Sequence, residues 1–443
     1  MAVDKRGGGD FGGRVRTAAL VASAVVVAGA ATVPALAVGG GTPATPGPGT
    51  AGASATVSVG RVSYDLGDLA FVPGAPYEGK SELAAVVRYP EGPDGKGPTR
   101  GRHPLIVMQH GQWATCADRA AQRGLTKAQK ALALAEKAGD EAGVARQTEI
   151  IEKMSDRLWA WPCKAGVSPL PSSSGYDYLA RSLARQGFVV VSVGADGINA
   201  TSGGQADSVY QARAALINKH LDLWRQLDVG KGPLRGKLKD PRTGRAVGAA
   251  FAGHLDLGRV GTLGHSMGGG GVMQQVSDKR HGDWPAGVKV RAALGLAPTA
   301  TWENEPVTKV PLAVLWGTCD QVNTGEYVRW NRKTNKAPLH GITLTGGNHN
   351  YFNTQWSPGS GQVAAVDDAI PGERPGRCVS QDGRNQQHRG LDEATQRRIA
   401  TGYTVAFFRR YLLGDTSADA LLTGRKKLPG VPGVVKVEYV KPH

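Results

Sequence analysis

The stretch "TLGHSMGGGG", residues Thr262 to Gly271, places a single serine among glycines in the pattern G-x-S-x-G. The residues before it, "RVGTL", are typical of a strand, and "GGGGVMQQVSDK" after it is consistent with a helix that starts at the serine. A nucleophile on such a sharp strand-turn-helix connection has a strained backbone, so its neighbours must be small. We therefore predict a nucleophile elbow in which Ser266 is the nucleophile and Gly264 and Gly268 provide clearance. The alternative is an ordinary glycine-rich turn.

A serine hydroxyl needs a base, and the base needs an acid that orients it. In the expected arrangement both follow the serine, the acid first. Asp320 directly follows the apolar run "PLAVLWGTC", and His349 directly follows "LHGITLTGGN". Loops at the carboxyl ends of parallel strands project into the site, which favours these two residues. The rivals lack a directly preceding strand: Glu303, Glu305, Asp367 and Asp368 as the acid, and His388 as the base.

The same chemistry requires backbone amides that stabilise an oxyanion. The amide of Met267 is one expected donor, and the second is expected from Gln112 or Trp113, after the run "HPLIVMQHG". His265 is expected to support the elbow rather than act as a base, because adjacent side chains there point in different directions. An apolar acyl pocket could be lined by tryptophans in nearby segments, namely Trp113, Trp159, Trp161, Trp302 and Trp356.

Strand-like apolar runs alternate with helical patterns along the chain. This alternation predicts an α/β fold with a mainly parallel central sheet that is flanked by helices. Helices are expected over 175–187 and 207–228, where apolar residues recur on one face. The strands are expected within 82–90, 103–111, 187–197, 259–266, 290–298, 310–320 and 339–349.

The segment 114–163 interrupts this alternation and reads as a helical hairpin, a possible lid or a surface insertion without a gating role. Thr126 with Gln129 forms a capping-box pattern, and Gly139 is placed to end the first helix. The second helix is expected to carry a stripe of apolar residues, Ile150, Ile151, Met154 and Leu158.

The four cysteines allow three pairings. Proximity favours Cys116 with Cys163 and Cys319 with Cys378, and the first pair would staple the hairpin at its base. A metal site is the competing interpretation, but the spacings CxxC and HxxxH are absent, so no metal is expected.

Residues 1–37 have the features of a signal peptide: a basic start, an apolar run over 18–31 that is short for a membrane span, and "ALA" before the expected cleavage after Ala37. A retained membrane anchor is the alternative. Residues 38–56 are rich in Ala, Gly, Pro and Thr and predict a flexible linker, which leaves 57–443 as the folded domain. These features favour a secreted protein.

The net charge is +16, and loss of the signal's four basic and two acidic residues lowers it to +14. This excess could attract nucleic acid, anionic polymers or membranes. No aromatic-basic interleaving or nucleic-acid module accompanies it, which favours a generally basic secreted surface without a nucleic-acid partner. The densest basic run, 231–245, is rich in Gly and Pro and predicts a solvated loop. We expect no cofactor and no stable membrane insertion after signal removal. The oligomeric state stays open.

From about Ser58 to Asp415 the chain resembles the α/β-hydrolase superfamily. The elbow "GHSMGGGG" is similar to that of secreted actinobacterial lipases and cutinase-like polyester hydrolases. The segment "YDYLARSLARQGFVVVSV" is similar to the helix and strand before the elbow in those enzymes and in chlorophyllase-like and platelet-activating-factor-acetylhydrolase-like proteins. The resemblance implies hydrolysis of a small-molecule or lipid-like carboxylic ester through an acyl-enzyme, with Ser266, Asp320 and His349 as the triad and Met267 in the oxyanion hole.

Three segments depart from the compact polyester hydrolases: the hairpin 114–163, the basic loop 231–258 and the long loop after His349. Polyester specificity is therefore not carried over. Two other functions remain open. The same triad could serve an acyltransferase or a cofactor-free perhydrolase, and the scaffold could instead belong to a non-catalytic cell-wall-binding protein.

Overall fold

A computed structural model describes residues 57–202, 207–301, 305–323, 325–365, 376–381, 386–431 and 433–443. The predicted signal peptide 1–37 and linker 38–56 lie outside these residues. In the described ranges, no helix is long and apolar enough to cross a membrane.

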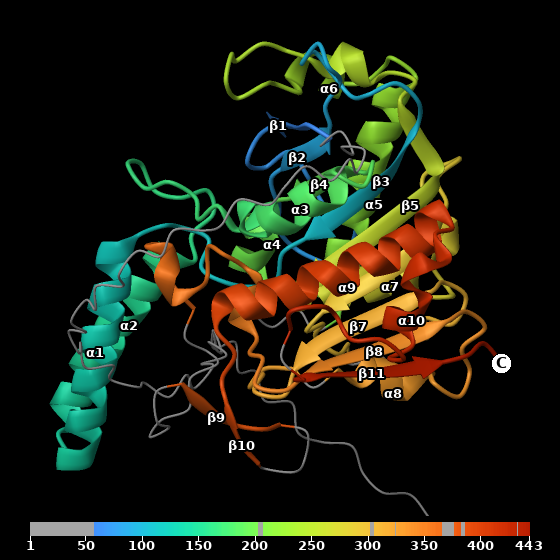
Figure 1. The fold of residues 1–443 in the computed structure, drawn as a ribbon. Coiled ribbons are helices and arrows are strands. Elements are labelled where there is room, and N and C mark those ends of the chain that lie inside the picture. Colours follow the sequence, from blue (N-terminus) through green and yellow to red (C-terminus); the bar gives the residue numbers. More distant parts are fainter. Residues whose placement is uncertain are drawn as a thin grey trace, which may run out of the picture.

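One large twisted sheet organises the described residues, with the strand order β1-β2-β4-β3-β5-β6-β7-β8-β11 (Figure 1). The six central strands, β4-β3-β5-β6-β7-β8, are parallel to one another. At the edges, β1 pairs antiparallel with β2, β2 with β4, and β11 with β8. The strands are β1 (Val59–Asp65), β2 (Ala84–Pro90), β3 (His103–Gln109), β4 (Val189–Val193), β5 (Leu255–His265), β6 (Val290–Leu296), β7 (Leu312–Gly317), β8 (Leu339–Leu344) and β11 (Val435–Val440). A separate small hairpin contains β9 (Arg377–Val379) and β10 (Gln387–Arg389).

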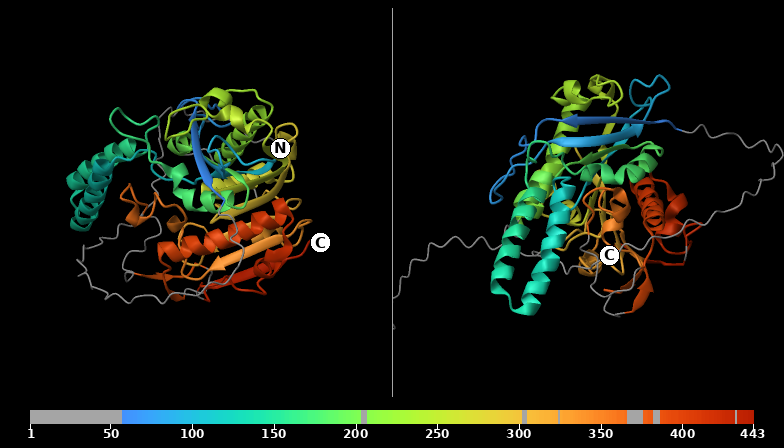
Figure 2. Two further views of the ribbon diagram at one scale, coloured as in Figure 1. Left: turned by 45° about the horizontal axis from the view of Figure 1, so that its top comes forward. Right: turned by 90° about the vertical axis from the view of Figure 1, so that its left-hand side faces the viewer.

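Helices cover both faces of the sheet (Figure 2). On β3, Leu105 and Val107 face a core shared with α5, α7 and α8, whereas Ile106 and Met108 face a core shared with α3 and α9. This period-two alternation is expected for a strand that is buried on both faces. The helices are α1 (Arg119–Ala138), α2 (Glu141–Leu158), α3 (Asp177–Ala184), α4 (Asp196–Thr201), α5 (Ser208–Asp228), α6 (Leu234–Lys237), α7 (Met267–Val276), α8 (Glu326–Asn331), α9 (Glu393–Leu413) and α10 (Asp419–Leu422).

The predicted α/β architecture with a mainly parallel, helix-flanked sheet is confirmed. Each of the seven expected strand segments contains a strand, β2 to β8, and the two expected helices are α3 and α5. The edge strands β1 and β11 and the long helix α9 were not predicted. The run 231–245, expected to be a loop, also contains the short helix α6.

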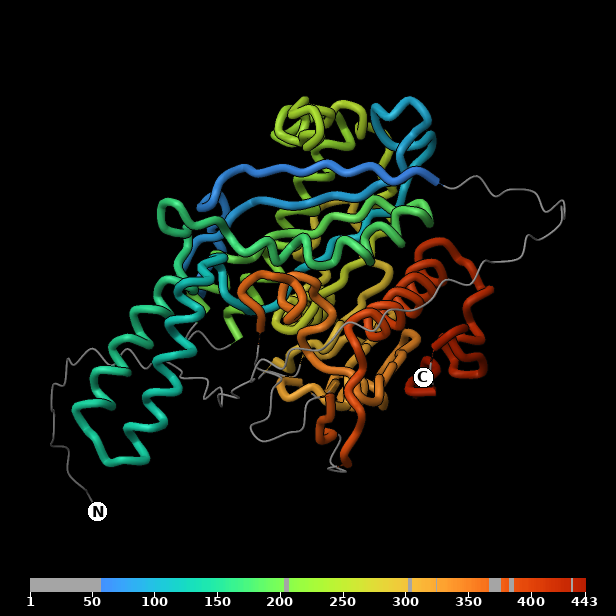
Figure 3. Tube along the Cα trace, turned by 60° about the vertical axis from the view of Figure 1, so that its left-hand side comes forward, coloured from blue at the N-terminus to red at the C-terminus, as the bar shows by residue number. Residues whose placement is uncertain are grey.

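The helical hairpin of α1 and α2 extends away from the body of the protein (Figures 2 and 3). Gly139 ends α1 with a φ of 67°, as expected for a left-handed cap. The predicted capping box at Thr126 is wrong, because α1 begins at Arg119 and its N-cap is Asp118, whose carboxylate accepts from the amide of Ala121 at 2.8 Å. Thr126 lies inside the helix, and its hydroxyl donates to the carbonyl of Gln122.

Both expected disulfides are present, Cys116–Cys163 and Cys319–Cys378. The first closes the base of the hairpin, where Arg157 also forms an ion pair with Asp118 at 2.6 Å. The second ties the loop after β7 to β9. The loops after β3 and β7 are therefore covalently anchored. A lid function of the hairpin stays a prediction.

A buried histidine on the core side of α5 gives a test of stability against pH. Burial, with a smaller effect of Lys219, lowers the pKa of His220 to about 3, and its Nδ1 lies 2.6 Å from the Tyr64 hydroxyl. Because the unfolded chain binds a proton that the native state does not, this group makes stability fall as the pH drops below the ordinary histidine pKa. His220→Asn keeps a hydrogen-bonding partner for Tyr64 but removes the titration.

We expect the unfolding free energy of the wild-type protein to drop by about 2 kcal/mol more than that of His220→Asn between about pH 6 and pH 4.5. Urea denaturation at several pH values measures this difference. Parallel pH profiles of the two proteins would contradict a neutral buried His220.

Candidate active site

Ser266 lies at a sharp turn between β5 and α7. Its φ is 55° and its ψ is −127°, a conformation that side-chain-bearing residues rarely adopt. Backbone hydrogen bonds hold the turn: the Ser266 amide donates to the carbonyl of Leu296 at 3.0 Å, and its carbonyl accepts from Thr299 at 3.0 Å and Gly270 at 3.2 Å. A strained backbone of this kind persists only where the surroundings fix it, and such strain clusters at functional sites.

The glycines around Ser266 are packing requirements. A Cβ on Gly264 would collide with the backbone of Gly268, and a Cβ on Gly268 would collide with the carbonyl oxygens of Gln109 and His110. The later glycines of the run touch other elements, because a Cβ there would meet Pro298 from Gly269, the Tyr210 ring from Gly270 and Arg213 from Gly271. The run therefore lets the first turns of α7 approach β3, β5 and α5 more closely than side chains would allow.

Asp320 and His349 form a buried pair at the carboxyl ends of adjacent strands. The Asp320 Oδ2 lies 2.9 Å from Nδ1 of His349, and the two side chains are 0% and 2% exposed. The other carboxylate oxygen, Oδ1, accepts from the amides of Val322 at 2.8 Å and Asn323 at 2.7 Å. These amides fix the carboxylate, and a fixed carboxylate holds His349 in the tautomer that carries its proton on Nδ1 and its lone pair on Nε2.

His265 packs under the site as a neutral support. Its Nε2 donates to the carbonyl of His349 at 2.9 Å, so its Nδ1 accepts from the hydroxyl of Tyr176 at 2.9 Å. Burial, followed by the nearby His349, lowers the pKa of His265 well below its usual value. Because both ring nitrogens are occupied and the ring stays neutral, His265 is a poor candidate for the base.

Ser266 and His349 are both neighbours of His265, which precedes Ser266 in the chain and whose ring centroid lies 4.9 Å from that of His349. Within the described ranges, no hydrogen bond joins the Ser266 hydroxyl to His349. Catalytic hydrogen bonds in unliganded sites are often longer than in the complex with substrate. The structure thus joins Asp320 to His349 and places Ser266 directly after His265, the residue that contacts His349.

The loop after β3 passes directly over the serine. A Cβ on Gly111 would collide with the Ser266 side chain and with the carbonyl of His265, so only glycine fits at this crossing. The next two residues are the predicted oxyanion candidates. Gln112 donates from its side chain to Ser202 at 2.8 Å, and the Trp113 indole donates to the carbonyl of Val363 at 2.8 Å. Their side chains are anchored away from Ser266, which leaves backbone amides at the crossing.

A buried polar network that the sequence analysis missed holds this loop. Asn199 donates to the carbonyls of Gly111 at 3.2 Å and Trp113 at 3.3 Å, and its own oxygen accepts from Arg213. Arg213 is fully buried and also donates to the carbonyl of His110 at 3.2 Å. Burial lowers the pKa of this guanidinium to about 10, so it remains charged at neutral pH. Asn199 opens a sequon-like "NAT", but it is buried and serves this network.

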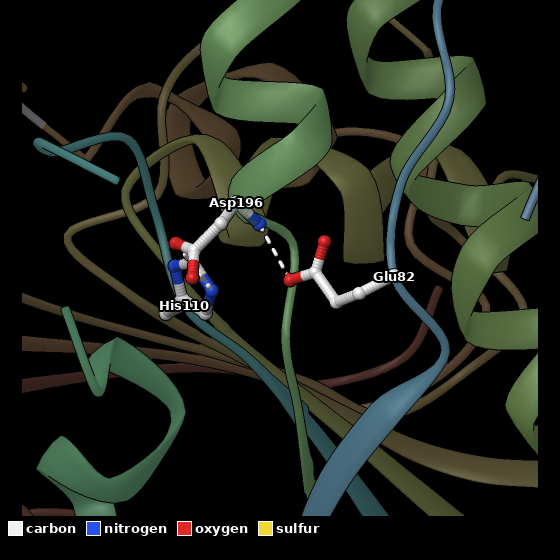
Figure 4. Close-up of side chains that lie close together, drawn as sticks. All are labelled: Glu82, His110 and Asp196. Carbon is white, nitrogen blue, oxygen red and sulfur yellow. Dashed lines mark hydrogen bonds and ion pairs between the residues drawn. The ribbon is translucent and has the colours of Figure 1, made fainter. Parts of the chain in front are cut away.

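Three ionisable residues beside this network meet the spacing of a metal site, Glu82, His110 and Asp196 (Figure 4). Most of their acceptor atoms are already used. The two Glu82 oxygens accept from the amides of Asp196 at 2.7 Å and Gly197 at 3.0 Å, and Nε2 of His110 accepts from the amide of Ala195 at 2.9 Å. Burial lowers the pKa of His110 to about 3 and raises that of Asp196 well above its usual value. This donor set fits a structural network better than a cation.

The remaining predicted residues lie elsewhere or outside the described residues. Glu305 is buried, and it accepts from the hydroxyl of Ser277 at 2.7 Å, whereas the carboxylate that contacts His349 is that of Asp320. His388 lies on β10 in the small separate sheet. Trp356 is fully buried, with its indole donating to Ser172, so its predicted place on the rim of an acyl pocket is wrong. Glu303, Asp367, Asp368 and Trp302 lie outside the described residues.

Comparison with known proteins adds no relative: no protein-family model matches the chain, and no curated protein sequence matches it at a significant level. The interpretation of the site therefore depends on its geometry.

Proposed function

We propose that this protein is a serine hydrolase with an α/β-hydrolase fold that cleaves carboxylic esters through an acyl-enzyme. The observation that carries the proposal is the strained Ser266 turn at the end of β5, combined with the Asp320–His349 hydrogen bond at the ends of β7 and β8. The chain order Ser, Asp, His and the strand-turn-helix setting are those of a nucleophile elbow. The two disulfides fit an oxidising, extracellular location.

In the proposed reaction, the Ser266 hydroxyl oxygen attacks the ester carbonyl carbon while Nε2 of His349 takes its proton. Asp320 stabilises the imidazolium that forms. The tetrahedral intermediate collapses, the bond to the alcohol breaks, and His349 gives its proton to the leaving alkoxide. In the second half of the reaction, His349 takes a proton from water, and the water oxygen attacks the carbonyl carbon of the acyl-enzyme. The bond to Ser266 then breaks, His349 returns the proton to the serine oxygen, and the carboxylic acid is released.

The oxyanion would be stabilised by two backbone amides. Met267 is the first residue of α7, so its amide has no acceptor within the helix. For the second donor, the direction of one peptide group supports Gln112. The Gly111 carbonyl points to Asn199 and to Nδ1 of His110, and in a trans peptide the following amide points the opposite way. The amide of Gln112 is thereby turned away from the Asn199 network.

Labelling with a fluorophosphonate tests the proposal. We expect stoichiometric labelling of the folded chain, with the adduct on the peptide that contains Ser266, and hydrolysis of at least one ester in a series of short and long acyl chains. Heat-denatured protein is the control, because labelling requires the assembled triad. A folded protein that neither labels nor cleaves any ester of the series would refute the proposal. Addition of an alcohol or hydrogen peroxide separates hydrolysis from acyl transfer.

A further inference from the structure

Helix α1 carries a continuous cationic face along the hairpin. Its first basic residue is Arg119, and the other basic residues follow it by 4, 8, 11 and 18 positions. At about 100° of rotation per residue, all of them fall within an arc of about 80° around the helix axis. The only acidic residue of α1, Glu136, lies on another side of the helix. We call the following set the cationic face: Arg119, Arg123, Lys127, Lys130 and Lys137.

Among the described residues, no acidic side chain neutralises the charges of this face. None of its residues takes part in an ion pair in the part of the chain that the structure describes, and Arg119 bonds only a carbonyl, that of Gly361. The opposite side of α1 packs on α2 through the small buried residues Ala121 and Ala128. The cationic face therefore points away from the partner helix, on a hairpin that projects from the body (Figure 3).

An exposed apolar residue lies on the same face. Leu134 is 70% exposed and follows Lys130 by four residues, so it stands in line with the basic side chains near the tip of the hairpin. A large apolar side chain among cations is unfavourable in water but suits the boundary between lipid headgroups and acyl chains. A soluble anionic polymer would use the charges and leave the leucine in water.

We propose that the cationic face of α1, with Leu134, docks this protein on an anionic phospholipid surface. The basic side chains pair with the lipid phosphates, and Leu134 enters the interfacial layer without crossing it. Helix α2 cannot replace α1 in this role, because it carries four acidic residues, Glu141, Glu149, Glu152 and Asp156. Docking is a property of the hairpin and does not depend on the proposed ester hydrolysis.

Vesicle co-sedimentation tests the proposal with the full chain and without any measurement of turnover. One set of vesicles contains equal parts of phosphatidylglycerol and phosphatidylcholine, and the other contains phosphatidylcholine alone. We expect binding to the anionic vesicles that weakens at high salt, and little binding to the neutral ones. Lys127→Glu/Lys130→Glu should bind the anionic vesicles at least about 30-fold more weakly, and Leu134→Ser about tenfold more weakly.

The control is Arg235→Glu/Lys237→Glu, which makes the same change in net charge on exposed residues of the basic loop around α6. It should keep most of the binding. Equal loss in this control would show that overall charge, and not the face of α1, attracts the vesicles, which overturns the proposal. Binding of soluble polyphosphate without binding of anionic vesicles would also overturn it. Circular dichroism checks that each variant is folded.

Discussion

Replacing Ser266 with alanine should lower kcat for ester hydrolysis by about 10⁶-fold while the protein stays folded. The substitution removes the attacking oxygen but keeps the Cβ, so the φ of 55° and the backbone bonds of the turn are undisturbed. Hydrolysis that remains would come from the oxyanion amides and from substrate binding, which alone give a residual acceleration over water. Steady-state kinetics with the best ester of the series, together with fluorophosphonate labelling, measures the loss.

Ser277→Ala is the matched control for this variant. Ser277 ends the same helix that begins after Ser266, it is buried, and its hydroxyl donates to Glu305 at 2.7 Å. Its loss should cost about 1 kcal/mol of stability and leave kcat within a fewfold of wild type. If Ser266→Ala hydrolyses the ester as fast as Ser277→Ala, Ser266 is not the nucleophile.

The central strands were predictable because a strand that is buried on both faces of the sheet has a continuous run of apolar residues. The edge strands were not, since each has only one neighbouring strand and a half-exposed surface. In β11 the apolar positions alternate with Lys436 and Glu438, and the strand is only six residues long. Such a segment adopts its register from its partner β8, which a reading of local sequence does not include. For α9, the four-residue spacing of Ile399, Tyr403 and Phe407 was an available signal.

The three residues of the proposed triad could be found from the sequence because each follows a recognisable strand. The network that holds the loop after β3 had no such signal. Asn199 lies on α4, Arg213 lies on α5, and the carbonyls they bind belong to the loop after β3. Only the folded sheet brings these three segments together. A buried arginine in an amphipathic helix looks, in sequence, like one more charge on the solvent face.

The difference between the predicted and the observed start of α1 has a tertiary cause. Asp118 and Thr126 both satisfy preferences for an N-cap, and the sequence between them is strongly helical. The carboxylate of Asp118 has a second partner in Arg157 of α2, which ties the cap to the base of the hairpin. Tertiary structure thus selected the earlier of two plausible starts.

Replacing Asp320 with asparagine should lower kcat by about 10⁴-fold with little change in stability. In the native site, Oδ1 accepts from two backbone amides and Oδ2 accepts from Nδ1–H of His349. The amide variant keeps an oxygen for the backbone and therefore turns its NH₂ toward His349. Two donors then face each other, so the imidazole moves its proton to Nε2. That nitrogen can no longer accept the proton of Ser266, although every atom stays near its original position.

Asp278→Asn is the matched control, because Oδ1 of Asp278 also accepts from two backbone amides, those of Thr308 at 3.0 Å and Lys309 at 3.2 Å. Its Oδ2 accepts from the Thr308 hydroxyl, where Oδ2 of Asp320 accepts from a histidine. The two variants should lose similar stability in urea denaturation, whereas only Asp320→Asn should lose activity. If Asp320→Asn keeps more than about a tenth of the wild-type kcat, another acid orients His349, because a misoriented base costs far more than tenfold. The corresponding substitutions Glu303→Gln, Asp367→Asn and Asp368→Asn would then identify that acid.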